Sequence, residues 1–449
     1  MRGADPSMSD TTHDAIHDRT VRDADAPLPW PVFAIVFALM VVDFVDRNIV
    51  VSMLPHLKAE WNPSDGQLGA LVSVVSVTVA VGTIPLSVLA DRWSRVRSIF
   101  LMAIVWSGAT IACAFAASYG QLLAARAVVG LGEAAYGPVG AALLASRFPL
   151  RMRTGVLGAF FAASLFGSVL GVVLGGFIAD RWGWQAGFGA VGLPGLLVAA
   201  MFILIVRDDD AIASAAARRD RRTAWVGVRE IVDALIRPRT LLLTCLGGSL
   251  QLVLVSSAFT WLPSYFHRYY GLAPDQAGLR TGIIVLLAGI GAVLWSLLAD
   301  RLSTAWPRAR LHVSAAASVA TAVLMGTAFA ALDPGIAQLA LIAAGAVAMT
   351  GTIGPAAAVV IDVIRPALRA TAASVLALAQ NLAGLAAGPV VAGVLSDRYG
   401  LTFAMSATPL FSALAAGVFV VAARTYVADV ANAELQEPVA AGPRAPRIA

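Results

Sequence analysis

Apolar and polar residues alternate in long blocks along the chain. Twelve apolar blocks are separated by short polar connections, and each block is long enough to cross a bilayer, which takes roughly 20 residues in a helix. The pattern predicts an all-α membrane protein with 12 transmembrane helices. The blocks lie at about residues 30–55, 66–90, 98–118, 120–146, 154–179, 186–206, 240–265, 276–299, 311–331, 335–361, 369–395 and 401–423.

A short Asp-Arg pair recurs at the end of the second helix in each group of three. The first and third pairs are 209 residues apart, and the second and fourth are 217 residues apart. A repeat of this length predicts two pseudo-symmetric six-helix bundles, an arrangement typical of carriers that work by alternating access. The four pairs are Asp91-Arg92, Asp180-Arg181, Asp300-Arg301 and Asp397-Arg398.

The connection between the two halves and the two ends of the chain lack the long apolar blocks. Apolar residues from Trp225 to Leu235 share one face of a short helix that Pro238 ends, which predicts an amphipathic helix lying on the membrane. The ends show no hydrophobic period and are expected to be disordered. The predicted units are an N-terminal tail (1–29), a first bundle (30–206), a central loop (207–239), a second bundle (240–424) and a C-terminal tail (425–449).

Composition and charge support a membrane protein. The chain is 59% hydrophobic and 13% charged, with a mean hydropathy of +0.79, whereas soluble proteins are about 25% charged. Of the 32 Lys and Arg residues, 25 fall in the tails, the central loop and the connections on the same side; five fall on the other side and two lie within helices. Because basic residues accumulate on the cytoplasmic side, we expect cytoplasmic termini in a bacterial inner membrane. The net charge of +5 therefore gives no reason to expect a nucleic-acid partner.

Two charged residues lie inside the fourth apolar block. Arg126, Gly130, Glu133 and Gly137 are spaced so that they share one helical face. A charge inside the bilayer costs about 2.5–3.5 kcal/mol on insertion scales, and such residues are usually functional. We therefore interpret this face as the wall of a charged cleft, while a buried structural ion pair is the alternative. Tyr136 belongs to the same stretch and is included among the candidate site residues.

The first helix carries three further charges, Asp43, Asp46 and Arg47. Counted from the helix ends, Arg47 and Arg126 lie at similar depths, so the five charges are predicted to form one cluster. Two arginines leave one of three carboxylates without a cation, and a buried carboxylate of this kind takes up a proton readily. Glu133 is our first choice for this proton-coupling carboxylate and Asp46 the second. The alternative for Asp43 is a structural pair with Arg47, one helical turn away.

The second half is much less polar than the first. Its helices 7, 8 and 9 have no ionisable residue in their centres, so a central cavity would be polar on one side and apolar on the other. This favours an amphiphile or an aromatic anion over a sugar, whose hydroxyls need many hydrogen-bonding partners. The few polar residues available there are Gln251, Ser256, Ser257, Thr350, Thr352, Gln380 and Asn381.

Catalysis and metal binding are not indicated. The five histidines and two cysteines lack the spacing of a metal site, and we find no nucleophile and base paired within the membrane. We expect no enzyme activity and no cofactor, with a proton as the coupling ion and the lipid bilayer and a small molecule as partners of a monomer. A drug exporter is one alternative. A non-transporting membrane sensor is another, although it would be expected to carry a soluble signalling domain.

The connection after the second helix reads Ser87-Val-Leu-Ala-Asp91-Arg92-Trp-Ser94-Arg95. Its Asp-Arg and following arginine resemble the first loop motif of the major facilitator superfamily, with serines in place of the motif's two glycines. The likeness to that superfamily spans about residues 30–425. A weaker copy begins at Asp300-Arg301. The resemblance implies the two-bundle fold of that superfamily and a gate on the cytoplasmic side. The residues to which it assigns this gate are Asp91, Arg92, Arg95, Asp300 and Arg301.

Four stretches distinguish subgroups within the superfamily. They are Val45-Asp46-Arg47, Arg126 to Ala134, Trp261-Leu-Pro-Ser-Tyr265 with Gly271 and Ala277-Gly278, and Asn381 to Pro389. In these stretches the chain is most similar to the spinster-like group. The organic-anion symporters, which include hexuronate carriers, share the Asp-Arg in helix 1 and the Gly-x-x-Glu in helix 4, and are the second candidate. The resemblance implies a secondary transporter of an amphiphilic, lysolipid-like or organic-anion substrate.

Overall fold

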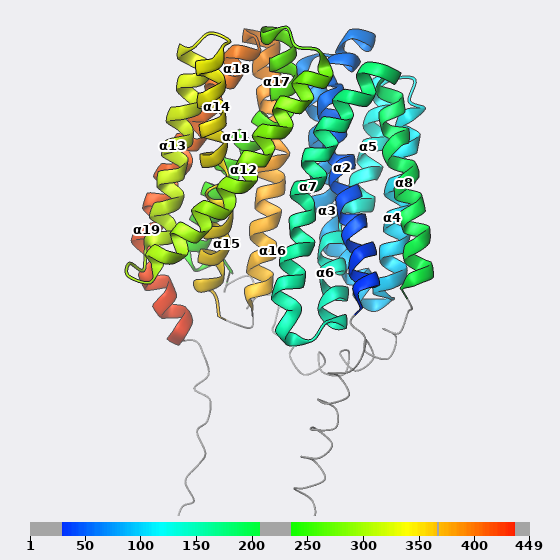
Figure 1. Ribbon diagram of the computed structural model, residues 1–449. Coiled ribbons are helices and arrows are strands. Elements are labelled where there is room, and N and C mark those ends of the chain that lie inside the picture. Colours follow the sequence, from blue (N-terminus) through cyan, green and yellow to red (C-terminus); the bar gives the residue numbers. More distant parts are fainter. Residues whose placement is uncertain (1–28, 207–234, 366–367, 436–449) are drawn as a thin grey trace, which may run out of the picture.

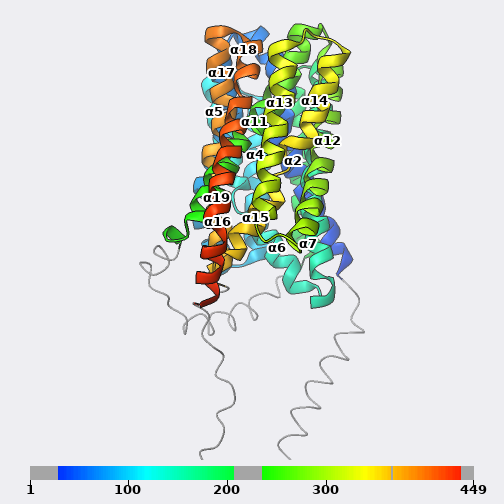
Figure 2. The same cartoon turned by 90° about the vertical axis from the view of Figure 1, so that its left-hand side faces the viewer.

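The computed structural model describes residues 29–206, 235–365 and 368–435, which are almost entirely helical and include no β-strand. Two six-helix halves stand side by side (Figure 1), and the view turned by 90° has the second half in front (Figure 2). The first half contains α2 (Trp30–Trp61), α3 (Asp65–Arg92), α4 (Arg95–Ala114), α5 (Tyr119–Glu133) with α6 (Tyr136–Arg147), α7 (Leu150–Trp182) and α8 (Trp184–Ile205). The second contains α11 (Arg239–Tyr270), α12 (Pro274–Ser303), α13 (Ala309–Ala331), α14 (Ile336–Met349) with α15 (Ile353–Asp362), α16 (Arg369–Ala379) with η2 (Gln380–Leu385) and α17 (Ala387–Tyr399), and α18 (Leu401–Ala407) with α19 (Pro409–Leu435).

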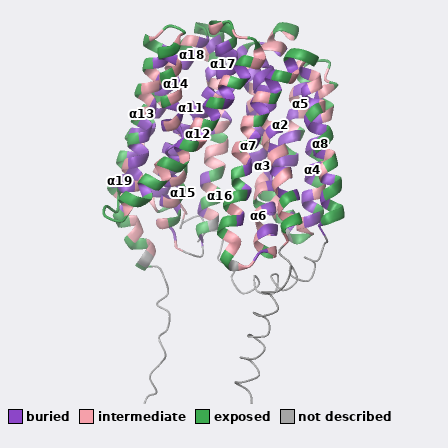
Figure 3. Cartoon of the chain, viewed as in Figure 1, coloured by how far each residue is buried: buried purple, intermediate pink, exposed green. Residues whose placement is uncertain are grey.

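The helices have the length and surface of membrane spans. Within the described residues, eleven helices are long and apolar enough to cross a bilayer. The 32-residue α2 is also long enough but carries Asp43, Asp46 and Arg47 in its middle. Large apolar side chains such as Val81 and Leu197 are 65% and 66% exposed, and exposed residues surround the outside of the bundle (Figure 3). An apolar surface of this extent belongs in lipid. The predicted 12-helix, two-bundle fold is therefore confirmed.

The fourth and tenth membrane helices are each broken near their middle. The breaks separate α5 from α6 after Glu133 and α14 from α15 around Thr350, and these two residues are 217 positions apart, the spacing of the internal repeat. Neighbouring helices satisfy the carbonyl groups that the breaks release. Thr83 donates a hydrogen bond to the carbonyl of Ala134 at 2.8 Å, and Gln251 donates to that of Met349 at 2.9 Å. Paired breaks at the midplane are where transporters of this symmetry place their binding sites.

The eleventh helix contains a six-residue π-helical turn, η2, between α16 and α17. Pro389 follows it and cannot donate a backbone hydrogen bond. Three side chains of α11 stabilise the region by donating to its carbonyl groups. Ser256 donates to Gly384 at 3.2 Å, Ser257 to Gly388 at 2.8 Å, and Trp261 to Pro389 at 3.1 Å. The helix is therefore held to α11 at the level where its own hydrogen-bonding pattern changes.

The two halves meet at one end of the molecule. We call the end where α2 begins and α19 ends the terminal end, and the end where α3 begins the distal end. At the distal end Arg268 of α11 forms two hydrogen bonds with the carboxylate of Asp65 of α3, at 2.6 and 2.8 Å. Asp397 of α17 accepts hydrogen bonds from the backbone nitrogens of Asp65 and Gly66, at 2.6 and 2.8 Å. A carboxylate from one half thus caps a helix of the other, where the helix dipole favours negative charge.

One predicted boundary is wrong. Residues 425–435, assigned to a disordered tail, continue α19 as a helix. The reason is polar contact with two neighbouring helices, α15 and α11. Tyr426 donates to Asp362 at 2.8 Å, and Asp429 accepts from the backbone of Thr240 at 2.9 Å. Residues 1–28 of the predicted N-terminal tail, 225–234 of the predicted amphipathic helix and 436–449 of the predicted C-terminal tail lie outside the described residues.

Candidate substrate cavity and charge cluster

A cavity of about 500 Å³ lies between the two halves. Its wall in the first half carries most of the polar groups, including Arg47, Asn48, Ser164 and Ser168, whereas its wall in the second half is mainly aliphatic. The cavity is therefore amphipathic, as the distribution of polar residues along the sequence predicts. The second half contributes Leu252, Val255, Ser256, Phe259, Thr260, Val285, Ala288, Gly289, Ala292, Thr350, Ile353, Gln380, Leu385 and Pro389.

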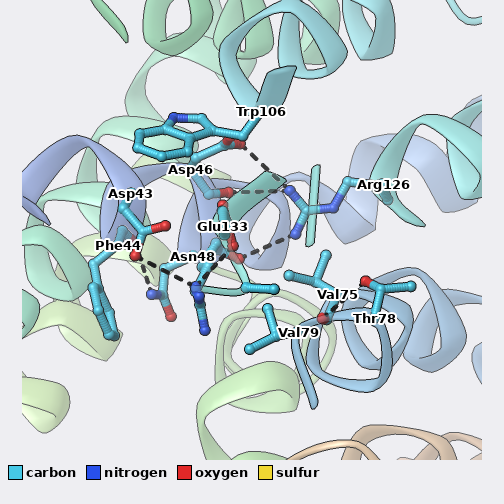
Figure 4. A network of polar contacts seen from close by, with 12 residues as sticks. Asp43, Phe44, Asp46, Asn48, Val75, Thr78, Val79, Trp106, Arg126 and Glu133 are labelled. Carbon is cyan, nitrogen blue, oxygen red and sulfur yellow. Dashed lines mark hydrogen bonds and ion pairs between the residues drawn. The ribbon is translucent and has the colours of Figure 1, made fainter. Parts of the chain in front are cut away.

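The structure brings the five predicted intramembrane charges into one cluster. Asp43, Asp46 and Arg47 come from α2, and Arg126 and Glu133 from α5. Their pairs are Arg47 with Glu133 (Nε to Oε2, 2.9 Å), Arg47 with Asp43 (Nε to Oδ2, 3.7 Å) and Arg126 with Asp46 (Nη1 to Oδ1, 3.5 Å). Figure 4 shows Asp46, Glu133 and Arg126 close together, with Asp43 and Asn48 to one side.

The two arginines of the cluster have different surroundings. The Arg126 side chain is fully buried, and besides Asp46 it donates to the backbone carbonyls of Asp46 (3.2 Å) and Arg47 (3.3 Å). The Arg47 side chain is 23% exposed and lines the cavity, and its Nε lies within ion-pair distance of Glu133 and Asp43. Both arginines line the cavity. Arg126 also holds α5 to α2, and Arg47 is the more exposed of the two cations.

The carboxylates also differ. Asp46 accepts from Arg126 and from the hydroxyl of Thr110 on α4. Glu133 and Asp43 share the single nitrogen of Arg47, and neither Oε1 of Glu133 nor Oδ1 of Asp43 has a hydrogen-bond partner in the described structure. Two carboxylates on one cation cannot both be charged cheaply in an apolar interior. The Asp43–Glu133 pair therefore shares one cation, while Asp46, the second choice from sequence, has Arg126 and Thr110 as partners.

Other predicted residues have structural positions. Tyr136 is fully buried outside the cavity lining and donates to the carbonyl of Val36 at 2.5 Å. Gly130 packs against α3, where an added Cβ would lie 2.6 Å from the carbonyl oxygen of Val75. This close approach explains the glycine as a helix-packing residue. Gly137 has open space where a Cβ would project.

The predicted gate residues all lie at the terminal end. Arg92 ends α3, Arg95 begins α4, and Arg301 is an exposed residue near the end of α12. The side chain of Asp91 lies outside the described part. Asp300 accepts from Arg310 at 3.2 Å, and Arg310 also pairs with Asp362 at 2.5 Å.

Several site residues were not found by sequence reasoning. Thr110 supports Asp46, and Asn48 donates to Ser168 of α7 at 3.2 Å on the cavity wall. In the sequence, Thr110 is marked only by a hydroxyl inside an apolar block, and Asn48 only by an amide directly after Arg47. Neither signal is strong by itself, because isolated Ser, Thr and Asn also occur in helices without a functional role.

Comparison with known proteins decides the family. The model of the major facilitator superfamily matches residues 36–389. The chain belongs to the major facilitator superfamily. It is a multi-pass membrane protein and a secondary transporter, and its relatives are transporters rather than enzymes.

The relatives also confirm the resemblance to the spinster-like group. Protein spinster of Drosophila melanogaster is 25% identical over 382 residues, 82% of this chain; the chain spans 62% of the length of that protein. The sphingosine-1-phosphate transporter SPNS2 of Mus musculus is 24% identical over 88% of this chain and 77% of its own. The hexuronate transporter of Bacillus subtilis (strain 168) is 24% identical over 91% of this chain and 98% of its own. Among solved structures, a bacterial homologue of human lysosomal Spinster, inward-facing and occupied, has a TM-score of 0.78 at 22% identity, over 90% of this chain and 99% of that one.

Proposed function

We propose that the protein is a proton-coupled transporter of an amphiphilic anion that works by alternating access. The observation that carries the proposal is the position of Arg47. Its guanidinium faces an otherwise mainly apolar cavity, and its Nε is shared by two buried carboxylates. One residue thereby connects an anion-binding position to a proton-binding position.

The shape and polarity of the cavity favour an amphiphile over a highly hydroxylated molecule. An anionic group would bind Arg47 beside Asn48 and Ser168, and an apolar chain or ring would lie against Leu252, Phe259 and their neighbours in the second half. A related protein named as a sphingosine-1-phosphate transporter supports this class. A related hexuronate transporter keeps small organic anions as the second class to be tested.

Proton binding and substrate binding would be linked through Arg47. When Asp43 and Glu133 are both charged, they neutralise its guanidinium; when one takes up a proton, Arg47 gains the capacity to bind an anion. Binding of either ligand therefore shifts the conformational equilibrium and so changes the affinity for the other ligand.

The terminal-end residues Asp91, Arg92, Arg95, Asp300 and Arg301 would form the gate on the cytoplasmic side. A single chain encloses the cavity, which is consistent with action as a monomer.

The coupling test is Glu133→Gln, which mimics the protonated carboxyl. In proteoliposomes this variant is expected to exchange labelled 1-dodecanoyl lysophosphatidate across the membrane at a rate near that of the wild type, but to lose accumulation driven by a pH gradient. Glu60→Gln is the matched control, because Glu60 pairs with Trp184 away from the cluster. Wild-type accumulation by Glu133→Gln would remove this residue from the coupling mechanism.

The same assay separates the substrate classes. Glucuronate replaces the lysophosphatidate in a second series, and a lipophilic cationic dye in a third. Transport of glucuronate alone would assign the chain to the organic-anion class. Transport of the dye without competition by either anion would favour a drug exporter.

Orientation in the membrane has its own test. The distribution of basic residues predicts that the terminal end and the 207–239 loop are cytoplasmic in a bacterial inner membrane. Ala215→Cys should therefore be protected from an impermeant thiol reagent in intact cells, whereas Ala273→Cys, at the exposed distal end, should react. Cys113 and Cys245 are buried and contribute little background. Labelling of position 215 from outside would reverse the orientation.

A further inference from the structure

The side chain of Gln380 lines the cavity and makes no hydrogen bond with any residue that the structure describes. Gln380 begins the π-helical turn η2 of the eleventh helix. Its amide lies against α11 at Gly248, where an added Cβ would be 3.0 Å from Nε2. A primary amide offers two donors and one acceptor. Gln380 is partly exposed to the cavity. A substrate that displaces water from this wall must pair with the amide or leave its groups unsatisfied, which is costly, so the amide points to a ligand.

The other polar groups on this wall are largely engaged. The hydroxyl of Ser256 donates to the carbonyl of Gly384 at 3.2 Å, and that of Thr350 donates to Ala288 at 2.5 Å. Asn381 carries the same amide as Gln380 but donates to Ala377 of its own helix at 2.9 Å and lies outside the cavity lining. Thr260 retains only a single hydroxyl. Gln380 therefore has the largest free hydrogen-bonding capacity on the wall of the second half.

The π-helical turn gives this position a structural basis. Such turns are rare and occur often at functional sites, because they redirect side chains relative to a regular helix. Here the turn is stabilised from outside, since Ser256 binds the Gly384 carbonyl, and from within, since the backbone nitrogen of Ala386 donates to Asn381 at 2.9 Å. The direction of the Gln380 side chain is thus set by a supported local geometry.

We propose that Gln380 is a specificity-determining residue that binds a neutral hydroxyl or amide group of the substrate while Arg47 holds its anionic group. The proposal rests on the proposed function, because it assumes an anion at Arg47. Arg47 belongs to the first half and Gln380 to the second, so a substrate bonded to both bridges the two halves across the cavity. An amphiphile with a hydroxyl near its anionic group satisfies both residues, whereas one with a bare chain satisfies only Arg47.

Two probes that differ by one hydroxyl test this assignment: 1-dodecanoyl lysophosphatidate and its 2-deoxy analogue. Binding to the purified full-length protein is measured for the wild type, for Gln380→Leu and for the control Asn381→Leu. The wild type should prefer the hydroxylated probe about tenfold, a value typical of one hydrogen bond. Gln380→Leu should lose this preference by weakening only the hydroxylated probe, and Asn381→Leu should retain it.

The outcomes distinguish this proposal from the proposed function. Equal affinity of the wild type for the two probes, or an equal loss of both in Gln380→Leu, refutes the role of Gln380 while the anion site at Arg47 stands. Binding of neither probe by the wild type refutes the amphiphile at Arg47 and the Gln380 assignment with it. A preference that survives in Gln380→Leu but is lost in Thr260→Val assigns the hydroxyl to Thr260 and also refutes the proposal.

Discussion

Arg126→Ala is expected to prevent stable folding, whereas Arg47→Ala should give a folded protein that no longer binds an anionic substrate. Arg126 is fully buried and pairs with Asp46, which has no other cation within ion-pair distance in the described structure. Removing one partner of a buried pair costs about 3–5 kcal/mol. Arg47 is partly exposed to the cavity, and its partners Asp43 and Glu133 can take up protons when it is removed.

Thermal unfolding of the detergent-purified variants, together with binding of 1-dodecanoyl lysophosphatidate, measures both effects. Arg126→Ala should show a low yield of monodisperse protein and a lowered midpoint. Arg47→Ala should keep the wild-type midpoint within a few degrees and lose about 10- to 100-fold in affinity, as expected for hydrogen bonds to a charged group.

The neutral pair Asp46→Asn/Arg126→Gln is the control for the structural role of Arg126. Because it removes both charges, it should recover much of the stability that Arg126→Ala loses. A stable Arg126→Ala protein that fails to bind the probe would instead make Arg126 a direct ligand of the substrate.

Local sequence patterns account for the fold and for the members of the charge cluster. Block length and the Asp-Arg repeat predict 12 helices in two halves, and helical spacing on α2 and α5 predicts that five charges meet. Spacing does not predict which arginine is the more exposed to the cavity. That depends on Asp46, which accepts from Thr110, and on two backbone carbonyls of α2, which only the packed structure places around Arg126.

Contacts between distant segments are the other part that sequence does not predict. Asp180 and Asp397 occupy equivalent places in the repeat, but Asp180 is exposed whereas Asp397 caps α3 across the two halves. The difference arises because Asp397 binds the backbone of Asp65 and Gly66, which lie more than 300 positions earlier in the sequence. Likewise, residues 425–435 carry no strong hydrophobic period, and their helix depends on Tyr426 and Asp429 binding other helices.

Breaking the distal contacts is expected to open the distal end. We call the group Lys58, Asp65, Arg268, Ser396 and Asp397 the distal lock. Asp65 is its centre: it binds Arg268 through two hydrogen bonds, accepts from Ser396 at 2.6 Å and lies 3.2 Å from Lys58. Alternating access requires this end to separate during the cycle. The lock therefore stabilises only the closed distal conformation.

Arg268→Ala should consequently raise the ratio of open to closed molecules at least tenfold, because each hydrogen bond to a charged group contributes about 1.5–3 kcal/mol. Spin labels at Ala117→Cys and Ala273→Cys, one in each half at the distal end, report the separation through distances measured by pulsed electron paramagnetic resonance.

Arg280→Ala is the matched control, since Arg280 is also a distal arginine of the second half but lies near Tyr270 of the same half. Asp65→Asn combined with Arg268→Ala should shift the distances little further than either change alone, because both remove the same interaction. An Arg268→Ala distance distribution identical to that of the wild type would show that packing of α7 on α12 and α3 on α17 closes this end without the lock.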